Sequence, residues 1–179
     1  MRGPKLDRVD RRILQLLQAN GRMTNIALAR RVGISPPPCL RRVRALEMAG
    51  LIRGYHADLA TEALGFAVTI FAQIGLQSQA EADLKAFENL VQSWPEVREA
   101  HMLAGETDFL LKIVAPDWDS YQRFLSANLT AAPNVAHVKS ALVLRVSKSV
   151  LGVPLAEAAD AHATGDAPTP TSLASARPR

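Results

Sequence analysis

A series of residues that begin and end helices near the N-terminus is the feature that most constrains what this chain can fold into. Thr24 suits a helix N-cap, and Gly33 suits the tight turn after the helix that Thr24 begins. Ser35 then caps a further helix whose first position is Pro36, where the missing N–H costs nothing, and Gly50 lies just past its end. The stretch therefore predicts two short helices separated by a tight turn.

A third helix is predicted upstream of this pair. Asp7 can cap it, Asn20-Gly21 ends it, and its apolar residues recur at the three-and-four spacing of one buried face. These residues are Leu6, Val9, Ile13, Leu16 and Leu17. Two short helices packed on a preceding helix form the helix-turn-helix arrangement, which sets its last helix into the major groove of DNA. We therefore expect a helix-turn-helix, winged-helix-like domain over residues 1–56.

The last of these helices should carry the DNA contacts. A step of 100° per residue divides it into two arcs. The arc that should face inward carries Pro36, Cys39, Leu40, Val43 and Leu46. The opposite arc carries Pro37, Pro38, Arg41, Arg44 and Ala45, with Arg42 at its edge. Arginine can pair with guanine edges or grip phosphate, although a merely solvated basic face is the alternative. Together with the two helix starts, the candidate DNA contacts are Thr24, Asn25, Ser35, Pro37, Pro38, Arg41, Arg42 and Arg44.

The charge distribution favours a polyanion partner for the N-terminal part alone. The formal net charge of +4 conceals 12 Lys and Arg against 3 Asp and Glu in residues 1–56. Residues 57–154 hold 7 basic residues against 11 acidic ones. A basic head on a mildly acidic body is the electrostatic footprint of a nucleic-acid-binding module joined to a module with another task.

Beyond a short strand expected at residues 51–56, the pattern changes from helical to strand period. The predicted elements are a strand over 66–76, a helix after a capping box at 78–81, strands over 97–103 and 109–114, a helix between 116 and 133, and a strand over 135–146. This βαββαβ order is the ferredoxin-like α+β unit, in which two helices cover one face of a four-stranded antiparallel sheet. Because alternating apolar residues leave the other face to be buried, we expect two chains to pair sheet to sheet.

The remaining segments complete the predicted organisation. Residues 57–64 form a linker, 65–154 the ferredoxin-like domain, and 155–179 an Ala, Pro, Ser and Thr rich tail that we expect to be disordered. No apolar run reaches the roughly 20 residues that span a bilayer, and the N-terminus lacks a secretory signal, so we expect a cytoplasmic protein without a membrane partner. Cys39 is the one cysteine and the four histidines are scattered, so no metal or other cofactor is expected.

Taken together, the two modules resemble the Lrp/AsnC (leucine-responsive regulatory protein, feast/famine) family of transcriptional regulators. The resemblance runs from Leu6 to Leu151 and rests on four segments in the same order: residues 6–14, 29–36 with 39–43, 52–55 and 105–112. It implies a sequence-specific regulator that binds double-stranded DNA and responds to a small effector, in this family an amino acid. It also implies a homodimer formed through the sheet domain that assembles to a tetramer or octamer.

The resemblance further implies where the effector binds. The family's Gly-x-x-Asp loop and the pocket positions fall on Met102, Gly105, Glu106, Thr107, Asp108, Thr130 and Leu142. Glycine lets backbone N–H groups approach a ligand carboxylate, and an acidic side chain can pair with an α-ammonium. An ordinary hairpin turn is the alternative for Gly105 and Asp108. Thr107 and Thr130 depart from the aromatic and apolar residues frequent in the family, so the effector's identity does not carry over.

Two other functions fit parts of the sequence. His101, Glu106 and Asp108 lie close enough along the chain to suggest the acid–base set of an enzyme. No nucleophile motif or phosphate-binding glycine loop accompanies them, so no catalytic residue is assigned and we expect no enzyme. An amino-acid-binding allosteric module without specific DNA regulation would explain the sheet domain but not the basic head.

Overall fold

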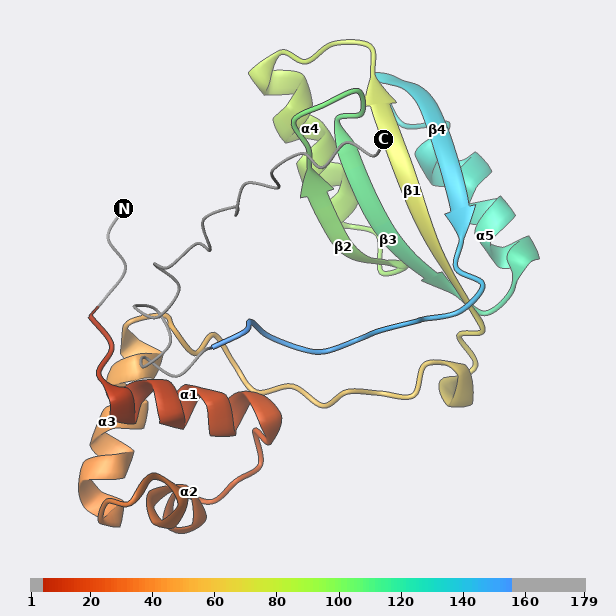
Figure 1. Ribbon diagram of the computed structural model, residues 1–179. Helices are drawn as coiled ribbons and strands as arrows, with labels where there is room; N and C mark the ends of the chain where they lie inside the picture. Colours follow the sequence, from red (N-terminus) through yellow and green to blue (C-terminus); the bar gives the residue numbers. More distant parts are fainter. Residues whose placement is uncertain (1–4, 156–179) are drawn as a thin grey trace, which may run out of the picture. The chain divides into compact units, whose positions relative to one another are not determined.

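The structure is a computed structural model that describes residues 5–155. The described part of the chain divides into two compact units (Figure 1), one made of residues 5–57 and 150–155 and the other of residues 58–149. Residues 150–154, which the sequence assigned to the second domain, thus group with the N-terminal unit. Residues 156–179 of the expected disordered tail lie outside the described residues.

Three helices build the N-terminal unit: α1 (Arg8–Ala19), α2 (Asn25–Val32) and α3 (Pro36–Met48). Asp7 accepts a hydrogen bond from the backbone N–H of Asp10, whose own carboxylate accepts from the backbone N–H of Asp7, so α1 begins in a full capping box. Thr24 caps α2 by accepting from the N–H of Ala27 at 3.2 Å. Gly33 ends α2 in the left-handed region, with φ of 81°.

Two details of the predicted head are wrong. Pro36 and Leu40 are exposed rather than buried, because α1 and α2 cover a narrower arc of α3, on which Cys39, Val43 and Leu46 are the buried residues. Residues 51–56 are not a strand. A strand needs a neighbouring strand for its N–H and C=O groups, and none pairs with this segment among the described residues. Leu51 and Ile52 instead pack against the helical core.

The second unit is a four-stranded antiparallel sheet in the order β2-β3-β1-β4. Its strands are β1 (Val68–Leu76), β2 (Val97–Met102), β3 (Phe109–Ala115) and β4 (Val135–Leu142). Its helices are α4 (Glu81–Gln92), α5 (Trp118–Phe124) and the π-helical turn η2 (Leu125–Leu129), after a short 3-10 turn η1 (Glu62–Leu64). Figure 1 shows α4 and α5 against one face of this sheet, as the βαββαβ order predicts.

The helices and the covered sheet face share one core. Ile70, Ile74, Leu111 and Ile113 point inward from the central strands, where they meet aromatic residues of the helices and their ends. Phe87, Trp94, Tyr121 and Phe124 are those aromatic residues, and Trp94 packs edge-on against both Phe87 and Phe124. The N-terminal unit has its own core around Ile13, Leu28 and Cys39, so each unit buries apolar surface independently.

Two further expectations about this unit need correction. The predicted capping box at residues 78–81 is absent, because α4 begins only at Glu81 and its N-cap residue is Ala80, which has no side-chain acceptor. Ser78 lies before the cap, where its hydroxyl donates to Asp83 and accepts from the N–H of Ala80. Strand β4 ends at Leu142, not Val146, since its neighbour β1 begins near the same level. Val143 makes one last backbone hydrogen bond, to Thr69.

Candidate DNA-binding and effector-binding sites

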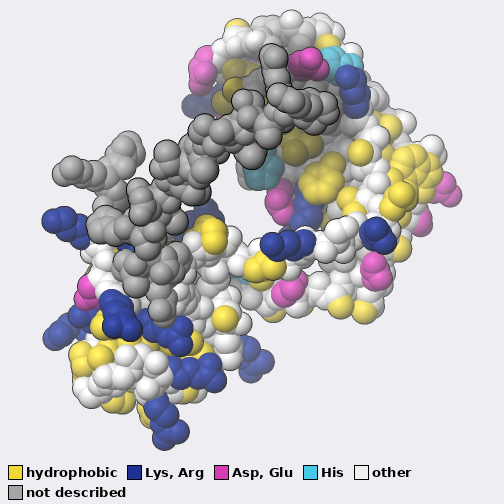
Figure 2. Space-filling view, in the orientation of Figure 1, with side chains coloured by type: hydrophobic (Ala, Val, Ile, Leu, Met, Phe, Trp, Pro, Cys, Tyr) yellow, Lys and Arg dark blue, Asp and Glu magenta, His cyan; other side chains and the backbone are white. Residues whose placement is uncertain are grey.

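Helix α3 presents a basic outer face. Arg41 and Arg44 are exposed, and neither joins an ion pair within residues 5–155. Pro37 is exposed and Pro38 is half-buried at the start of the helix. Ser35 occupies the N-cap position but makes no capping hydrogen bond with its side chain, so its exposed hydroxyl is available to a phosphate. Figure 2 shows Lys and Arg side chains gathered on this unit.

The start of α2 has a structural task. The Nδ2 group of Asn25 donates to the carbonyl oxygen of Pro36 at 2.8 Å, which fixes the beginning of α2 against the beginning of α3. The buried Oδ1 of Asn25 has no hydrogen-bond partner among the described groups. The hydroxyl oxygen of Thr24 accepts a hydrogen bond from the N–H of Ala27. Both residues therefore hold the angle between the two helices of the helix-turn-helix, whether or not they also reach DNA.

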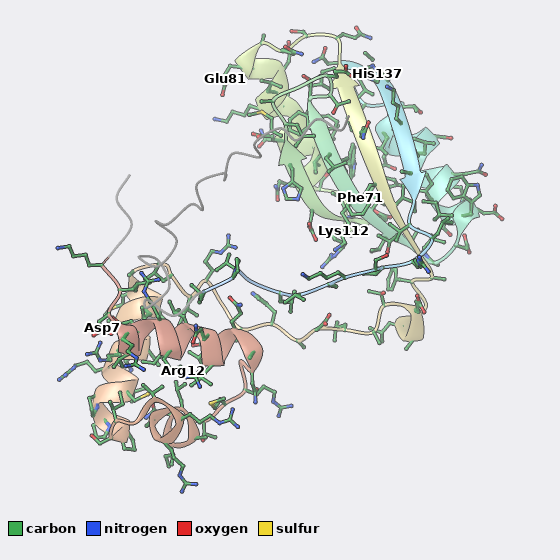
Figure 3. All side chains as sticks on the ribbon, in the orientation of Figure 1. Asp7, Arg12, Phe71, Glu81, Lys112 and His137 are labelled. Atoms are coloured by element: carbon green, nitrogen blue, oxygen red, sulfur yellow. The ribbon has the colours of Figure 1, made fainter. Side chains whose placement is uncertain are left out.

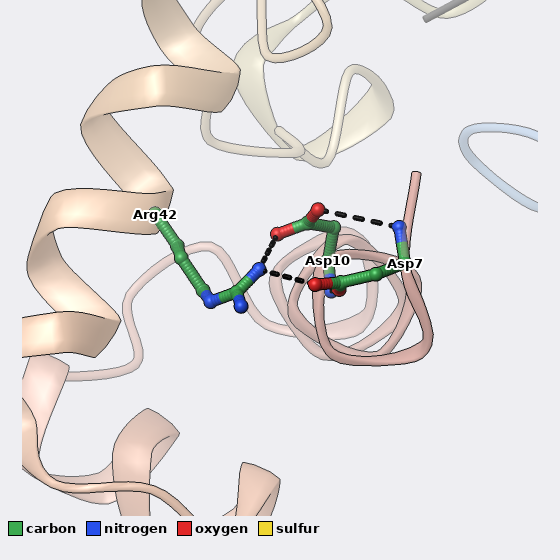
Figure 4. Close-up of polar contacts among 3 residues, drawn as sticks. All are labelled: Asp7, Asp10 and Arg42. Carbon is green, nitrogen blue, oxygen red and sulfur yellow. Dashed lines mark hydrogen bonds and ion pairs between the residues drawn. The ribbon is translucent and has the colours of Figure 1, made fainter. Parts of the chain in front are cut away.

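Arg42 points toward α1 rather than outward (Figure 4). Its NH1 group donates to Asp7 at 2.6 Å and to Asp10 at 2.8 Å. The hydrogen bonds that Arg42 donates to Asp10 and Asp7 raise the pKa of Arg42, and the backbone N–H of Asp10 is the main cause that lowers the pKa of Asp7. The two carboxylates of the α1 capping box thus also form ion pairs with Arg42 of α3, so the guanidinium has protein partners in the absence of DNA.

A second basic surface was missed at the sequence level. A pocket of about 440 Å³ between α1 and α2 is lined by arginines and contains no acidic side chain. Its lining residues are Arg8, Val9, Arg11, Arg12, Gln15, Arg31 and Val32. The spacing of Arg8, Arg11 and Arg12 at three and four residues places them on one side of α1 and would have indicated the cluster. Such a surface can hold a phosphate-rich backbone next to the unit.

Asp108 braces the predicted effector loop. Its two carboxylate oxygens accept from the backbone N–H of Leu76 at 2.7 Å and from Nε2 of Gln79 at 2.8 Å. Its own N–H donates to the carbonyl of Ile74, and its carbonyl accepts from Leu103. Asp108 therefore pins the turn between β2 and β3 to the end of β1. Glu106 is exposed and Thr107 half-buried in the same turn.

The other predicted effector residues are not brought together within one chain. Met102 pairs with Phe109 beside the turn, whereas Leu142 pairs with Ile70. Ile70 and Leu76 lie six residues apart on β1, which is about 20 Å of strand. Leu142 and the Asp108 turn thus lie at opposite ends of the sheet. Thr130 directs its hydroxyl back to the carbonyls of Leu125 and Ser126 at the end of η2.

The uncovered face of the sheet is mixed in character. Phe71 of β1 lies beside Lys112 of β3, and both are labelled in Figure 3. Lys112 donates to Glu99 of β2 at 2.8 Å, and this hydrogen bond is the main cause that lowers the pKa of Glu99. His101 contacts the other oxygen of Glu99. The apolar centre expected for sheet pairing is therefore flanked by an ion pair on β2 and β3.

His101 and Asp108, two of the residues considered for acid–base chemistry, have different hydrogen-bond partners. His101 bonds to Glu99, while Asp108 bonds to Leu76 and Gln79, so no described hydrogen bond links the first pair to the second. Among residues 5–155, no group of His, Cys, Asp and Glu side chains could hold a metal ion. The same described residues include no helix long and apolar enough to cross a membrane.

Sequence comparison assigns each unit to a known domain type. Residues 6–53 match a winged helix-turn-helix DNA-binding domain, and residues 69–151 match the Lrp/AsnC ligand binding domain. A leucine-responsive regulatory protein from Rhizobium meliloti (strain 1021) is 51% identical over 151 residues, 84% of this chain and 97% of that protein. The chain belongs to the Lrp/AsnC family. The leucine-responsive regulatory protein of Escherichia coli (strain K12) is 40% identical over 146 residues, covering 82% of this chain and 89% of its own.

Solved structures of Lrp/AsnC regulators have the same fold. A transcriptional regulator from Neisseria meningitidis in complex with L-Met has a TM-score of 0.80 and 38% identity, over 84% of this chain and 97% of its own. AsnC from E. coli has a TM-score of 0.76 and 26% identity, over 86% and 100% of the two chains. The family resemblance and the fold class predicted from the sequence are confirmed. The chain is a transcriptional regulator with a DNA-binding head and a ligand-binding domain.

Proposed function

We propose that this regulator reads duplex DNA with the outer face of α3 and is controlled by an amino acid bound at the sheet domain. The observation that carries the proposal is a pair of exposed arginines, Arg41 and Arg44, which form no ion pair with any other described residue and lie on the last helix of a helix-turn-helix. Such side chains are free to pair with base edges or phosphates. Because DNA is the partner, we place the protein in the cytoplasm, and we assign it no catalytic role.

The proposed DNA contacts fall into two groups. Ser35, Pro37, Pro38, Arg41 and Arg44 form the part that enters the groove, because they lie on the outer face or at the start of α3. Thr24, Asn25 and Arg42 support that part from behind, because their polar atoms already bind within the unit. The arginine pocket on α1 and α2 adds phosphate contacts beside the groove.

The proposed effector is an amino acid, as in the related Neisseria regulator solved with L-Met. Gly105 leaves backbone N–H groups of the turn open to a carboxylate, since a side-chain atom added at this position would meet nothing within 4 Å. Asp108 is fixed by two hydrogen bonds, and each oxygen keeps a second lone pair for an ammonium group. Glu106 and Thr107 border the same turn, and Met102 lies beside it.

An effector site of this composition needs more than one chain. Leu142 lies at the far end of the sheet from the turn, so we propose that Leu142 reaches the site from a neighbouring copy. We further propose a homodimer formed through the open sheet face around Phe71, which assembles to a tetramer or octamer. Thr130, at the end of η2, belongs to the rim of the same site.

A selected-pool DNA-binding experiment tests the proposal. The full chain is presented with random duplexes, and the enriched sequence is titrated at several salt concentrations with and without each common amino acid. We expect Arg44→Ala to weaken binding about 10- to 100-fold, whereas Arg123→Ala on α5 serves as the matched control and should leave it unchanged. One of the amino acids, L-Met among the first tested, should shift the affinity by about 5- to 150-fold. A wild-type protein that enriches no sequence and shows no salt dependence would contradict the proposal and leave an amino-acid-binding module.

A further inference from the structure

The C-terminal end of the described chain returns to the N-terminal unit. Val150–Leu155 group with that unit, although the strand that precedes them, β4, belongs to the other. The side chain of Gln18 on α1 grips the backbone of Val153 twice, as Nε2 donates to its carbonyl at 2.9 Å and Oε1 accepts from its N–H at 3.0 Å. Gln15, one turn earlier, donates to the carbonyl of Leu155 at 2.6 Å. Helix α1 therefore binds the backbone of an extended segment at two points.

An apolar groove lies under these hydrogen bonds. It encloses about 600 Å³ between α1 and residues 51–56, and the C-terminal segment forms one of its walls. The apolar lining residues are Leu6, Leu14, Leu17, Leu51, Ile52 and Tyr55. Leu155 is half-buried at this groove, while Val153 is 59% exposed. The segment is thus held by backbone hydrogen bonds and one apolar anchor, a combination that can open without unfolding the helices.

Gly152 fits this arrangement in two ways. Its φ of 85° lies in the left-handed region, which side chains disfavour. A side-chain atom added there would also lie 2.2 Å from the amide of Gln18. A side chain at residue 152 would therefore oppose both the backbone turn and the approach of Gln18.

We propose that residues 152–155 are a latch that binds the groove on α1 and gives the DNA-binding unit a second tether to the sheet domain. The first tether is the connection that enters β1, and the second is the connection that leaves β4. Two tethers restrict the orientations of the DNA-binding unit, so paired units lose less freedom when both bind one DNA molecule. Nine residues, 143–151, separate Leu142 from Gly152, so a ligand that moves the end of β4 has a short covalent path to the latch. The effect on DNA rests on the proposed function, whereas the latch itself does not.

The segment that binds α1 and closes one side of the groove is the chain's own C-terminal segment. The sequence between β4 and Gly152 is long enough to deliver it, and all three polar contacts are made within one chain. The same segment of a second copy would make its contacts only above the concentration at which copies associate. Protection of Val153 that falls on dilution would thus overturn the assignment to the same chain.

Amide hydrogen exchange of the full chain tests the latch directly. Gln18→Ala should raise the exchange rate of the Val153 amide by at least about tenfold, because its acceptor is removed. Gln92→Ala, an exposed glutamine at the end of α4, is the matched control and should change nothing at Val153. Gly152→Val attacks the same contact from the other side and should give the same increase. The double variant should exchange no faster than either single variant, because both remove one interaction. Unchanged protection in Gln18→Ala would overturn the latch.

DNA binding tests the tether separately. Gln18→Ala should weaken binding to a duplex with two selected half-sites by about 3- to 10-fold and leave a single half-site unchanged, since α3 is untouched. Equal affinity of wild type and variant for the two-site duplex would overturn the tether. Equal loss on both duplexes would do the same, because it would indicate a damaged head. A wild type that binds neither duplex would contradict the proposed function and leave the exchange result standing.

Discussion

The two units of this chain differ in how much of their site one chain completes. The N-terminal unit carries its exposed arginines, its helix caps and its own core within residues 5–57. The ligand-binding domain folds around an equally separate core, but its candidate effector residues lie at both ends of one sheet. A DNA-reading surface needs only one correctly presented helix, whereas a ligand pocket needs residues that surround the ligand on several sides. The first can therefore be read from a single chain, and the second requires its neighbours.

The largest expected effect concerns the independence of the two cores. Ile13 is fully buried in the N-terminal unit, and Ile13→Ala should lower the free energy of unfolding of that unit by about 2–5 kcal/mol. Both tryptophans, Trp94 and Trp118, lie in the other unit. Urea unfolding followed by tryptophan fluorescence should then keep its midpoint, while the helical signal in circular dichroism acquires an earlier transition.

A matched change in the second core provides the control. Leu111→Ala should shift the fluorescence midpoint, because Leu111 is fully buried in the sheet domain. If Ile13→Ala moves the fluorescence midpoint as far as Leu111→Ala does, the two units unfold as one and the comparison between them fails.

The next effect tests whether the effector site is shared between chains. Gly105→Val should block the turn, and Leu142→Glu should place a charge at the far end of β4, so each variant alone should lose amino-acid binding. When the two variants are unfolded and refolded together in equal amounts, a site built from two chains should be intact in about a quarter of cases. Titration calorimetry of the mixture measures that recovery. No recovery would place Leu142 in the same chain's site or outside it.

Much of the fold was predictable because local signals and packing agree. Thr24, Gly33 and Ser35-Pro36 fix the ends of α2 and α3, and the structure has those helices at Asn25–Val32 and Pro36–Met48. The alternation around Ile70 and Ile74 likewise identified β1. The errors arose where the structure of a segment depends on contacts with residues outside that segment. Residues 51–56 have a strand-like composition but no neighbouring strand among residues 5–155. Helix α4 begins after Ala80, two residues beyond Ser78, so Ser78 does not occupy the N-cap position.

The candidate sites were less predictable, because their side chains depend on contacts with residues far away in the sequence. Helical stepping placed Arg42 at the edge of the outward arc, but it could not show that Asp7 and Asp10 would engage it. It could have revealed the arginines of the α1 pocket, since Arg8, Arg11 and Arg12 are spaced as one helix face. The two hydrogen bonds between Gln18 and Val153 join residues that are 135 positions apart, and no local sequence pattern indicates such a pair.

The smallest expected effect is the pH dependence of the α1 cap. The N–H of Asp10 and the guanidinium of Arg42 lower the pKa of Asp7, so the stabilisation by this carboxylate is present above its unfolded pKa of about 4. It is lost as the pH falls through the lower folded value. Asp7→Ala should cost about 0.5–1 kcal/mol at pH 7, where the cap is charged, and less near pH 3. Asp58→Ala, an exposed aspartate in the other unit, should show no such pH-dependent difference in the circular dichroism transition of the helices. A constant cost of Asp7→Ala from pH 7 to pH 3 would mean that the cap acts through its hydrogen-bond geometry and not its charge, and that Arg42 gains no stabilisation from it.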